Sequence, residues 1–146
     1  MQLKKYTDYA LRVLIYCASK EEGELASIKE IAGVFSISQD HLGKIVHQLN
    51  RWGYIETVRG RYGGIKLAKR KEDINVGVIV RKMEDDFTLL ECFDPEKDHC
   101  ILSPACTLKH ALHEALEAFF AVLDSYTLAD LVGNPSMLKI LLERTQ

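Results

Sequence analysis

Residues 8–19 carry hydrophobic side chains at the spacing of an amphipathic helix. The apolar positions repeat at i, i+3, i+4 and i+7, so one face of the helix is expected to be buried. They are Leu11, Leu14, Ile15 and Ala18. Thr7 precedes this run and is the expected N-cap, because its hydroxyl oxygen can accept a hydrogen bond from an otherwise unpaired backbone N–H.

Two shorter helices are predicted next, joined by a turn. Ser27 and Glu30 form a capping box, in which each side chain accepts a hydrogen bond from the other residue's backbone N–H. The second helix therefore begins at Ile28 and ends near Phe35, and Ser38 caps a third helix. Apolar residues are expected to pack these two helices together: Ile31, Phe35, Ile37, Leu42 and Ile45. Such a pair is typical of a helix-turn-helix.

A β-hairpin is predicted after the third helix. Residues 54–58 alternate like a strand, residues 59–64 form a Gly-rich turn, and residues 65–67 return as the partner strand. The turn glycines are expected to supply positive φ angles: Gly60, Gly63 and Gly64. A helix-turn-helix followed by a hairpin is a winged helix, which we assign to residues 1–72.

Residues 73–146 are predicted to form a second region. A helix over residues 76–83 is followed by a loop rich in Pro, Asp and Cys, and a long helix begins near Thr107 with a broad apolar face that continues to Leu123. We interpret that face as a dimer seam, because large apolar surfaces outside a small domain usually have a partner. The alternative is that it covers the winged helix. The expected fold is thus mainly α, with a small hairpin wing and a long C-terminal dimerisation helix.

Composition and charge narrow the function. With 47% hydrophobic and 27% charged residues, the 146-residue chain fits a soluble globular protein and excludes collagen-like and disordered classes. Through Lys71 there are 13 Lys and Arg against 7 Asp and Glu, a net +6, and the remainder has 6 against 14, a net −8. The first half can therefore approach phosphates. No signal peptide or membrane span is evident, so we expect a cytoplasmic protein without membrane contact.

Polar side chains on the third helix and at the hairpin tip are the expected DNA contacts. The helix presents groups suited to base edges and phosphates in a major groove: Ser38, Gln39, His41 and Lys44. Arg59 and Arg61 flank Gly60 and are expected to enter a narrow minor groove. The alternative for the helix residues is that they form an ordinary solvent-exposed helix face. Asp40 lies on the same side and would repel phosphate. With the charge of this half, the combination predicts binding to double-stranded DNA.

Three of the four cysteines lie within fifteen residues: Cys92, Cys100 and Cys106. The intervals of seven and five residues fit structural zinc sites poorly, because those sites usually pair ligands two to four residues apart and use four. Three thiolates in one loop instead suit an iron-sulfur cluster. For the fourth ligand, His99 and His110 lie in the same region, but we favour an ordinary surface histidine for both, and His113 is a weaker candidate.

Cys17 stands apart from the other cysteines, on the apolar pattern of the first predicted helix. Free cysteine behaves as a small hydrophobic residue when it is buried. We therefore expect Cys17 to belong to the core rather than to a site.

Four short motifs accompany the three cysteines: Tyr9-Ala10-Leu11-Arg12, Ile37-Ser38 with His41-Leu42, Arg59-Gly60 with Gly63-Gly64, and Leu67-Ala68. With them the chain resembles, over nearly its whole length, the Rrf-type winged-helix iron-sulfur regulators, which are dimeric bacterial transcription factors. The cysteine intervals are similar to those of the family's nitric-oxide-sensing repressors. Members that sense cluster assembly have a histidine three residues beyond the last cysteine, where this chain has Lys109, whose protonated amine is no iron ligand.

The resemblance implies a four-iron four-sulfur (4Fe-4S) cluster on each chain, held by the three cysteines and by an aspartate of the other protomer's first helix. Asp8 stands at that position. Without the resemblance, Asp8 is a first-turn carboxylate favoured by the helix dipole. The resemblance further implies a homodimeric repressor that binds a pseudo-palindromic operator and releases it when nitric oxide damages the cluster.

The residues by themselves leave two alternative functions to consider. The same architecture with a two-iron cluster would respond to iron, oxygen or cluster supply. A small thiol-redox or metal enzyme is disfavoured, because the chain lacks a Cys-x-x-Cys motif and a Gly-rich nucleotide loop. We therefore expect a regulator rather than an enzyme.

Overall fold

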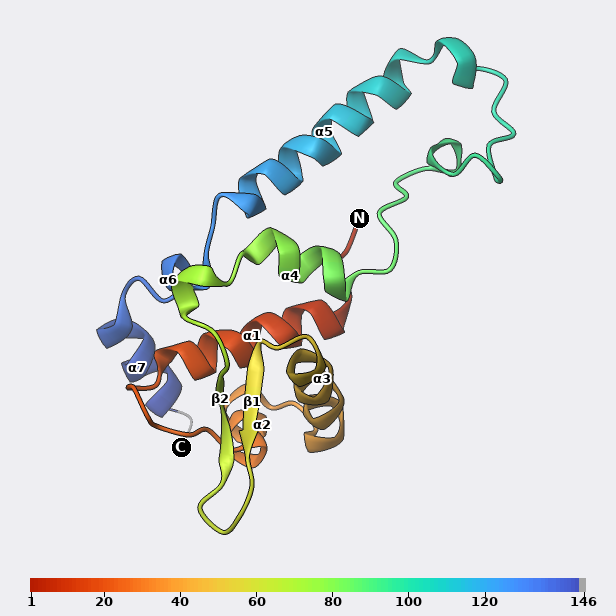
Figure 1. Ribbon diagram of the computed structural model, residues 1–146. Helices are drawn as coiled ribbons and strands as arrows, with labels where there is room; N and C mark the ends of the chain where they lie inside the picture. Colours follow the sequence, from red (N-terminus) through yellow and green to blue (C-terminus); the bar gives the residue numbers. More distant parts are fainter. Residues whose placement is uncertain (145–146) are drawn as a thin grey trace.

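A computed structural model of the chain describes residues 1–144. Figure 1 shows a body of packed helices with a hairpin at one end, from which α5 projects at the other. The helices and strands are α1 (Lys5–Ser19), α2 (Ile28–Phe35), α3 (Gln39–Arg51), β1 (Ile55–Val58), β2 (Gly64–Leu67), α4 (Val76–Met83), α5 (Thr107–Asp124), α6 (Leu128–Leu131) and α7 (Pro135–Glu143). Within residues 1–144, no helix is long and apolar enough to cross a bilayer.

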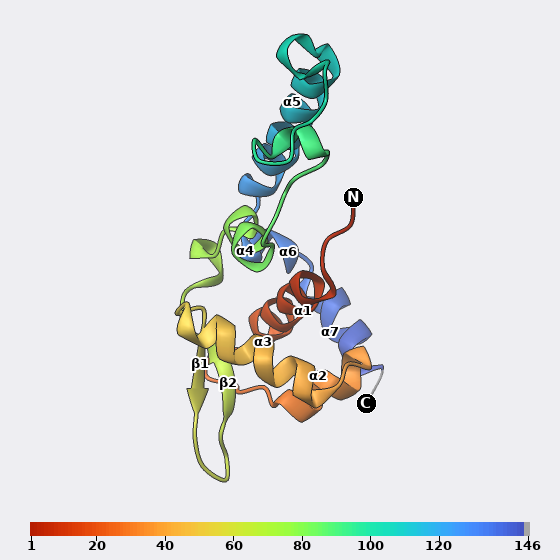
Figure 2. The ribbon, with the colours of Figure 1, turned by 90° about the vertical axis from the view of Figure 1, so that its right-hand side faces the viewer.

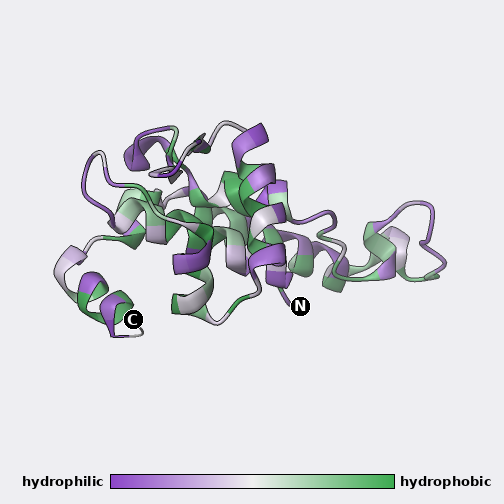
Figure 3. Cartoon of the chain, turned by 90° about the horizontal axis from the view of Figure 1, so that it is seen from below, coloured by the Kyte–Doolittle hydropathy of each residue, from purple (hydrophilic) through white to green (hydrophobic). Residues whose placement is uncertain are grey.

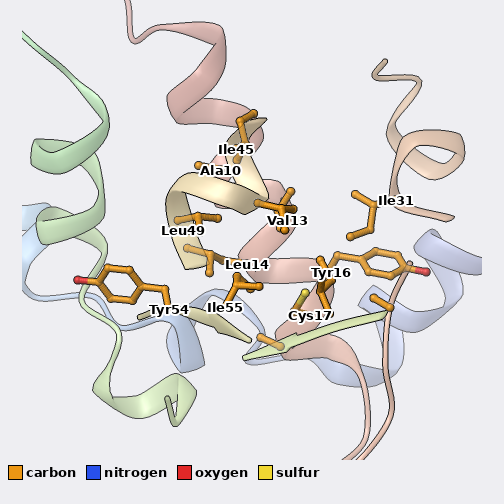
Figure 4. Close-up of a cluster of buried hydrophobic side chains, with 14 of the residues drawn as sticks. Ala10, Val13, Leu14, Tyr16, Cys17, Ile31, Ile45, Leu49, Tyr54 and Ile55 are labelled. Carbon is orange, nitrogen blue, oxygen red and sulfur yellow. The ribbon is translucent and has the colours of Figure 1, made fainter. Parts of the chain in front are cut away.

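Helix α1 is the centre of the body and packs against α3, α4, α6, α7 and β2. Val13 and Leu14 are fully buried, and full burial of such a side chain stabilises the fold by about 1.5–3 kcal/mol. Figure 4 shows the surrounding cluster, with α1 side chains between those of α3 and the hairpin. In Figure 3 hydrophobic residues concentrate in these inner helices and hydrophilic ones on the loops that extend outward. The predicted first helix is confirmed.

The start of α1 differs from the prediction. Lys4, not Thr7, is the N-cap, and Thr7 lies inside the first turn, completely buried. The Thr7 hydroxyl donates a hydrogen bond to Glu84 Oε1 at 2.5 Å, and the Lys4 backbone N–H donates to the same oxygen at 2.7 Å. A carboxylate eighty residues away along the chain thus accepts the hydrogen bond of a backbone N–H that has no partner within the helix. A local capping pattern could not predict this contact.

The helix-turn-helix forms as predicted. Ser27 Oγ accepts from the Glu30 N–H at 3.0 Å, and Glu30 accepts from the Ser27 N–H at 3.2 Å, which completes the capping box of α2. Ser38 Oγ accepts from the His41 N–H at 3.1 Å and caps α3. Between the helices, Ser36 adopts a left-handed conformation with φ 54°, which turns the chain sharply.

Strands β1 and β2 pair antiparallel, with Ile55 opposite Leu67. Among the turn glycines only Gly60 has a positive φ, 115°, so the expectation of positive φ at Gly63 and Gly64 was wrong. These two residues are required by close approach instead. A Cβ at Gly63 would lie 2.1 Å from the Val58 carbonyl oxygen, and one at Gly64 would lie 2.6 Å from the Ala26 carbonyl oxygen. Side chains at either position would collide with backbone.

Helix α5 is joined to the body at its C-terminal end. Arg81 of α4 donates hydrogen bonds to both carboxylate oxygens of Asp124, and its guanidinium lies 4.2 Å from the centre of the Phe120 ring. A Cβ at Gly77 would lie 1.9 Å from Asp124 Oδ1 and 3.0 Å from the Asp124 backbone nitrogen, so a larger residue would displace the carboxylate that Arg81 binds. The long helix from Thr107 is confirmed, whereas α6 and α7 lie outside the predicted elements.

The predicted division after residue 72 stays a prediction. The main core contains residues from both sides of it, including Leu14 and Ile45 on one side and Ile74 and Leu128 on the other. A smaller cluster of Val76, Val80 and Phe120 lies between α4 and α5.

Candidate DNA interface and cluster-ligand segment

Helix α3 separates a buried face from an exposed polar one. Its buried residues anchor it in the core: Leu42, Ile45, Val46 and Leu49. All four residues predicted from this region to contact DNA are exposed: Ser38, Gln39, His41 and Lys44. The Ser38 oxygen accepts the capping hydrogen bond, but its hydroxyl hydrogen can still be donated to a phosphate. A helix held in the core by one face thus exposes these polar side chains to solvent near its N-terminal end.

The hairpin turn projects beyond the body on the side of α2 and α3, away from α5, in both Figure 1 and Figure 2. Arg59 and Arg61 are exposed on this turn. Tyr62 is 85% exposed, and the Arg61 guanidinium lies 5.7 Å from the centre of its ring. Tyr62 was not among the predicted contacts, although an aromatic residue inside a basic, Gly-rich turn is a signal that could have identified it. The turn combines positive charge with an exposed ring.

The three clustered cysteines lie on the segment between α4 and α5, which passes beside α5 before it joins the outer end of that helix (Figure 1). Cys92 is in a short 3-10 turn and is 9% exposed, while Cys100 and Cys106 are partly exposed. None of them forms a disulfide. Cys106 is the N-cap of α5, where its Sγ accepts a hydrogen bond from the Lys109 N–H at 3.4 Å.

Asp98 organises the loop that carries Cys100 and Cys106. Its carboxylate accepts hydrogen bonds from the Ser103 hydroxyl at 2.7 Å and from the Cys100 N–H at 3.2 Å, and it pairs with the Lys109 ammonium at 3.4 Å. The hydrogen bond from Ser103, supported by the other two contacts, holds the pKa of Asp98 below its ordinary value. Sequence reasoning missed Asp98, although an aspartate two residues before a cysteine is typical of an Asx turn.

The donor set fits an iron-sulfur cluster in its chemistry. Thiol sulfurs are the ligands that iron-sulfur clusters use, and backbone N–H donors near the sulfur, as at Cys106, are a normal part of such sites. Among the described residues, however, no three side chains of His, Cys, Asp or Glu lie close enough to hold a metal ion. One chain by itself therefore places the three cysteines on one segment without bringing all three sulfurs within reach of one metal ion.

Asp8 lies in the first turn of α1, and its carboxylate pairs with Arg12 one turn later. The two oxygens lie 3.0 Å from Arg12 Nε and 2.8 Å from Arg12 Nη2. Both side chains are more than 40% exposed, and such i,i+4 pairs contribute only about 0.3–0.5 kcal/mol. Asp8 can therefore exchange this partner for another at little energetic cost.

The remaining candidate ligands have ordinary surroundings. His99, His110 and His113 are exposed, and His113 lies 3.6 Å from Glu117 on the same helix. Cys17 is 7% exposed within the main core, and burial raises the pKa of its thiol to about 12. The prediction that Cys17 is a buried hydrophobic residue is confirmed.

The apolar face of α5 is largely uncovered in a single chain. Leu108 is 61% exposed and Val122 is 58% exposed, and Phe120 is the buried residue of this helix. In the adjoining cysteine segment, Ile101 is 93% exposed and Leu102 is 64% exposed. An apolar surface of this extent on a projecting helix is typical of a protein-protein interface.

Comparisons with known proteins agree with this geometry. The family model Rrf2, described as an iron-dependent transcriptional regulator, matches residues 3–134. The chain is 57% identical over 142 residues to the HTH-type transcriptional regulator NsrR of Oceanobacillus iheyensis, with 97% of each chain covered. It is 58% identical over 134 residues to the NsrR of Bacillus subtilis, with 92% of each chain covered.

Solved structures confirm the winged helix-turn-helix fold. CymR, the global cysteine regulator of B. subtilis, matches with a TM-score of 0.74 and 28% identity, covering 91% of this chain and 97% of that one. T. potens IscR matches with a TM-score of 0.72 and 24% identity, covering 94% and 90%. The second similarity shows the fold alone.

Proposed function

This chain belongs to the Rrf2 family and is a DNA-binding transcriptional regulator rather than an enzyme, and we propose that it is a repressor that releases its operator in response to nitric oxide. The relatives are bacterial regulators of transcription, which confirms the expected cytoplasmic location. Similarity to NsrR over nearly the full length implies an iron-sulfur cluster. The observation that carries the proposal is the segment with three free cysteines, joined through α4 to the DNA-binding body.

For the operator, α3 enters a major groove and the hairpin turn enters the adjacent minor groove. The proposed contacts are Ser38, Gln39, His41, Lys44, Arg59 and Arg61, all of them exposed. The core fixes the backbone of α3, so few degrees of freedom are lost when its side chains bind. The positive charge of the first half supplies the attraction to phosphate that does not depend on sequence.

Arg59→Ala is expected to weaken operator binding by at least about 1 kcal/mol, roughly 5-fold, because it removes a cation from the minor groove. The measurement is fluorescence anisotropy with an operator duplex at one fixed salt concentration. Lys139→Ala on α7 makes the same change of charge outside the proposed interface and should bind as wild type does. Equal affinity of the Arg59→Ala protein would remove Arg59 from the interface.

For the cluster, we propose one 4Fe-4S group per chain, held by Cys92, Cys100 and Cys106, with Asp8 of the partner as the fourth ligand. Because the three sulfurs are not gathered in the chain by itself, the segment has to close when the cluster binds. Its short 3-10 turns and loops permit this closure, since few buried contacts hold them. A two-iron cluster is the alternative form.

The partner is a second copy of the chain. The exposed apolar face of α5 would be buried in such a homodimer, and a two-fold arrangement would bring the α1 of one protomer toward the cysteine segment of its partner. Two copies of the α3 surface would then face a pseudo-palindromic operator.

When bound, the cluster supplies iron that reacts with nitric oxide. The chain would hold the cluster through three sulfur ligands and, at Asp8, through one hard oxygen ligand, which is the weakest of the four donors for a soft iron site. Without iron, the Asp8 carboxylate would pair with Arg12 on its own helix, as it does in this structure. The contacts that hold the first turn of α1 would then differ. Because α3 packs directly on α1, such a change can affect the position of α3.

In the wild-type protein, nitric oxide is expected to weaken operator binding about 5- to 150-fold, the usual range of coupling between two sites. Asp8→Ala is expected to bind the operator but to lose most of this change in affinity. Arg12→Ala is the matched control, because it breaks the same ion pair without removing the proposed ligand. Anisotropy titrations before and after nitric oxide measure the change. An Asp8→Ala protein that responds like wild type would contradict the role of Asp8.

Native mass spectrometry of the anaerobically purified protein tests the rest of the proposal. A dimer whose mass includes one 4Fe-4S cluster per chain is expected. A two-iron mass would indicate a sensor of cluster supply, and a mass without iron would contradict the cluster while leaving DNA binding intact.

A further inference from the structure

The first turn of α1 contacts three different parts of the molecule through three consecutive residues. Successive side chains on an α-helix point about 100° apart, so Tyr6, Thr7 and Asp8 face three directions. The Tyr6 ring lies 5.9 Å from the His41 ring of α3, the Thr7 hydroxyl donates to Glu84 at the end of α4, and Asp8 pairs with Arg12. A displacement of this turn therefore affects all three neighbours.

The contact between Thr7 and Glu84 is the firmest of the three. Thr7 is fully buried and Glu84 is 9% exposed, and Glu84 Oε1 accepts hydrogen bonds from both the Thr7 hydroxyl and the Lys4 N–H. Lys4 also forms an ion pair with Asp85. Buried, hydrogen-bonded carboxylates are expensive to separate from their donors. The turn is thus fastened to the place where the segment with the cysteines begins.

The contact between Tyr6 and His41 reaches the recognition helix. The ring centroids are 5.9 Å apart at an interplanar angle of 57°, within the range in which aromatic pairs attract each other. His41 lies in the first turn of α3, and its side chain is exposed, so the core does not set its orientation. Tyr6, itself 38% exposed, is the aromatic neighbour that restricts the imidazole.

We propose that Tyr6 is a positioning residue for operator recognition, whose ring holds the His41 imidazole and passes a displacement of the first turn of α1 to the recognition helix of the same chain. The inference rests on the proposed function for the contact between His41 and DNA. The proposed bond from Asp8 to the partner's cluster would link the two protomers. The contact between Tyr6 and His41 adds a second route for the signal, within one protomer. The signal passes through one aromatic contact rather than through a movement of the whole helix.

A double-mutant cycle on the full-length, anaerobically purified protein tests the proposal. Operator affinity is measured by fluorescence anisotropy for wild type, Tyr6→Leu, His41→Ala and the double variant. Tyr6→Leu is expected to weaken operator binding about 5-fold, the low end of usual coupling, and to cause no further loss in the His41→Ala background. Binding to an unrelated duplex and the iron content per chain are expected to stay at wild-type values.

Tyr6→Phe is the conservative variant, because it keeps the ring that contacts His41, and it is expected to bind the operator like wild type. Tyr126→Leu is the matched control: this tyrosine is 46% exposed and follows α5. Its operator affinity should not change. Thermal unfolding of each variant separates loss of positioning from loss of fold.

Three outcomes would overturn the inference. If the Tyr6→Leu and His41→Ala losses multiply, Tyr6 does not act through His41. If Tyr6→Phe is as defective as Tyr6→Leu, the hydroxyl and not the ring is responsible. If His41→Ala binds the operator like wild type, the inference fails together with the proposed DNA contact of His41, whereas the first two outcomes leave that contact standing.

Discussion

Cys106→Ser is expected to abolish cluster binding, whereas Cys17→Ala is expected to leave it unchanged. Three thiolates are the proposed ligands from this segment, and loss of one leaves too few sulfurs to hold a cluster. Cys106 also caps α5, but a serine hydroxyl is a better N-cap than a thiol, so the substitution removes the ligand while keeping the cap. The variant therefore isolates the chemistry from the fold.

Cys17 is the appropriate control because it is the one cysteine of the chain that lies outside the segment. It is buried in the core, and burial raises the pKa of its thiol to about 12, so it remains a protonated hydrophobic residue. Cys17→Ala should lower the free energy of unfolding by about 1 kcal/mol and retain the cluster. Iron and sulfide per chain after anaerobic reconstitution provide the measurement. Full iron content in the Cys106→Ser protein would remove Cys106 from the ligand set.

Gly63→Ala is expected to weaken operator binding at least about 10-fold, or about 1.4 kcal/mol, although no charge or proposed contact is removed. The added Cβ would lie 2.1 Å from the Val58 carbonyl oxygen and 2.9 Å from that of Gly60. Both neighbours are backbone atoms, so the turn has to open. Arg59 and Arg61, which this turn presents, would then lose their positions relative to α3.

Gly33→Ala in α2 is the control for the same chemical change. A Cβ there meets no atom within 4 Å, and alanine in a helix is favoured over glycine by about 0.5–1 kcal/mol. This variant should unfold at a higher denaturant concentration and bind the operator normally. Chemical denaturation and anisotropy titration of both proteins give the comparison. Wild-type affinity in Gly63→Ala would show that binding does not require this turn geometry.

Much of the fold follows from local patterns. The capping box of Ser27 and Glu30, the cap at Ser38 and the apolar spacing of α3 involve residues only three or four positions apart, so they can be recognised without knowledge of the rest of the chain. The same holds for the alternation of the hairpin and for the long apolar repeat of α5. The candidate DNA contacts followed from these elements, because once the buried face is known the exposed face is known as well.

The three cysteines were also identified from the sequence, since three thiols within fifteen residues restrict the chemistry wherever the segment lies. Their assignment as cluster ligands stays a prediction. Asp8 was named only by resemblance, because one carboxylate in a first helical turn carries no signal of its own.

The sequence by itself thus determined the elements, the exposed polar face of α3 and the chemistry of the cysteine segment, all of which depend on neighbours along the chain. Only the tertiary structure decided how these parts are joined. Glu84 caps α1 from eighty residues away, Gly63 admits a backbone oxygen, and Tyr6 meets His41. Each of these contacts joins residues on different elements or across a turn, and their distances are set by packing of the whole chain, which no local pattern encodes.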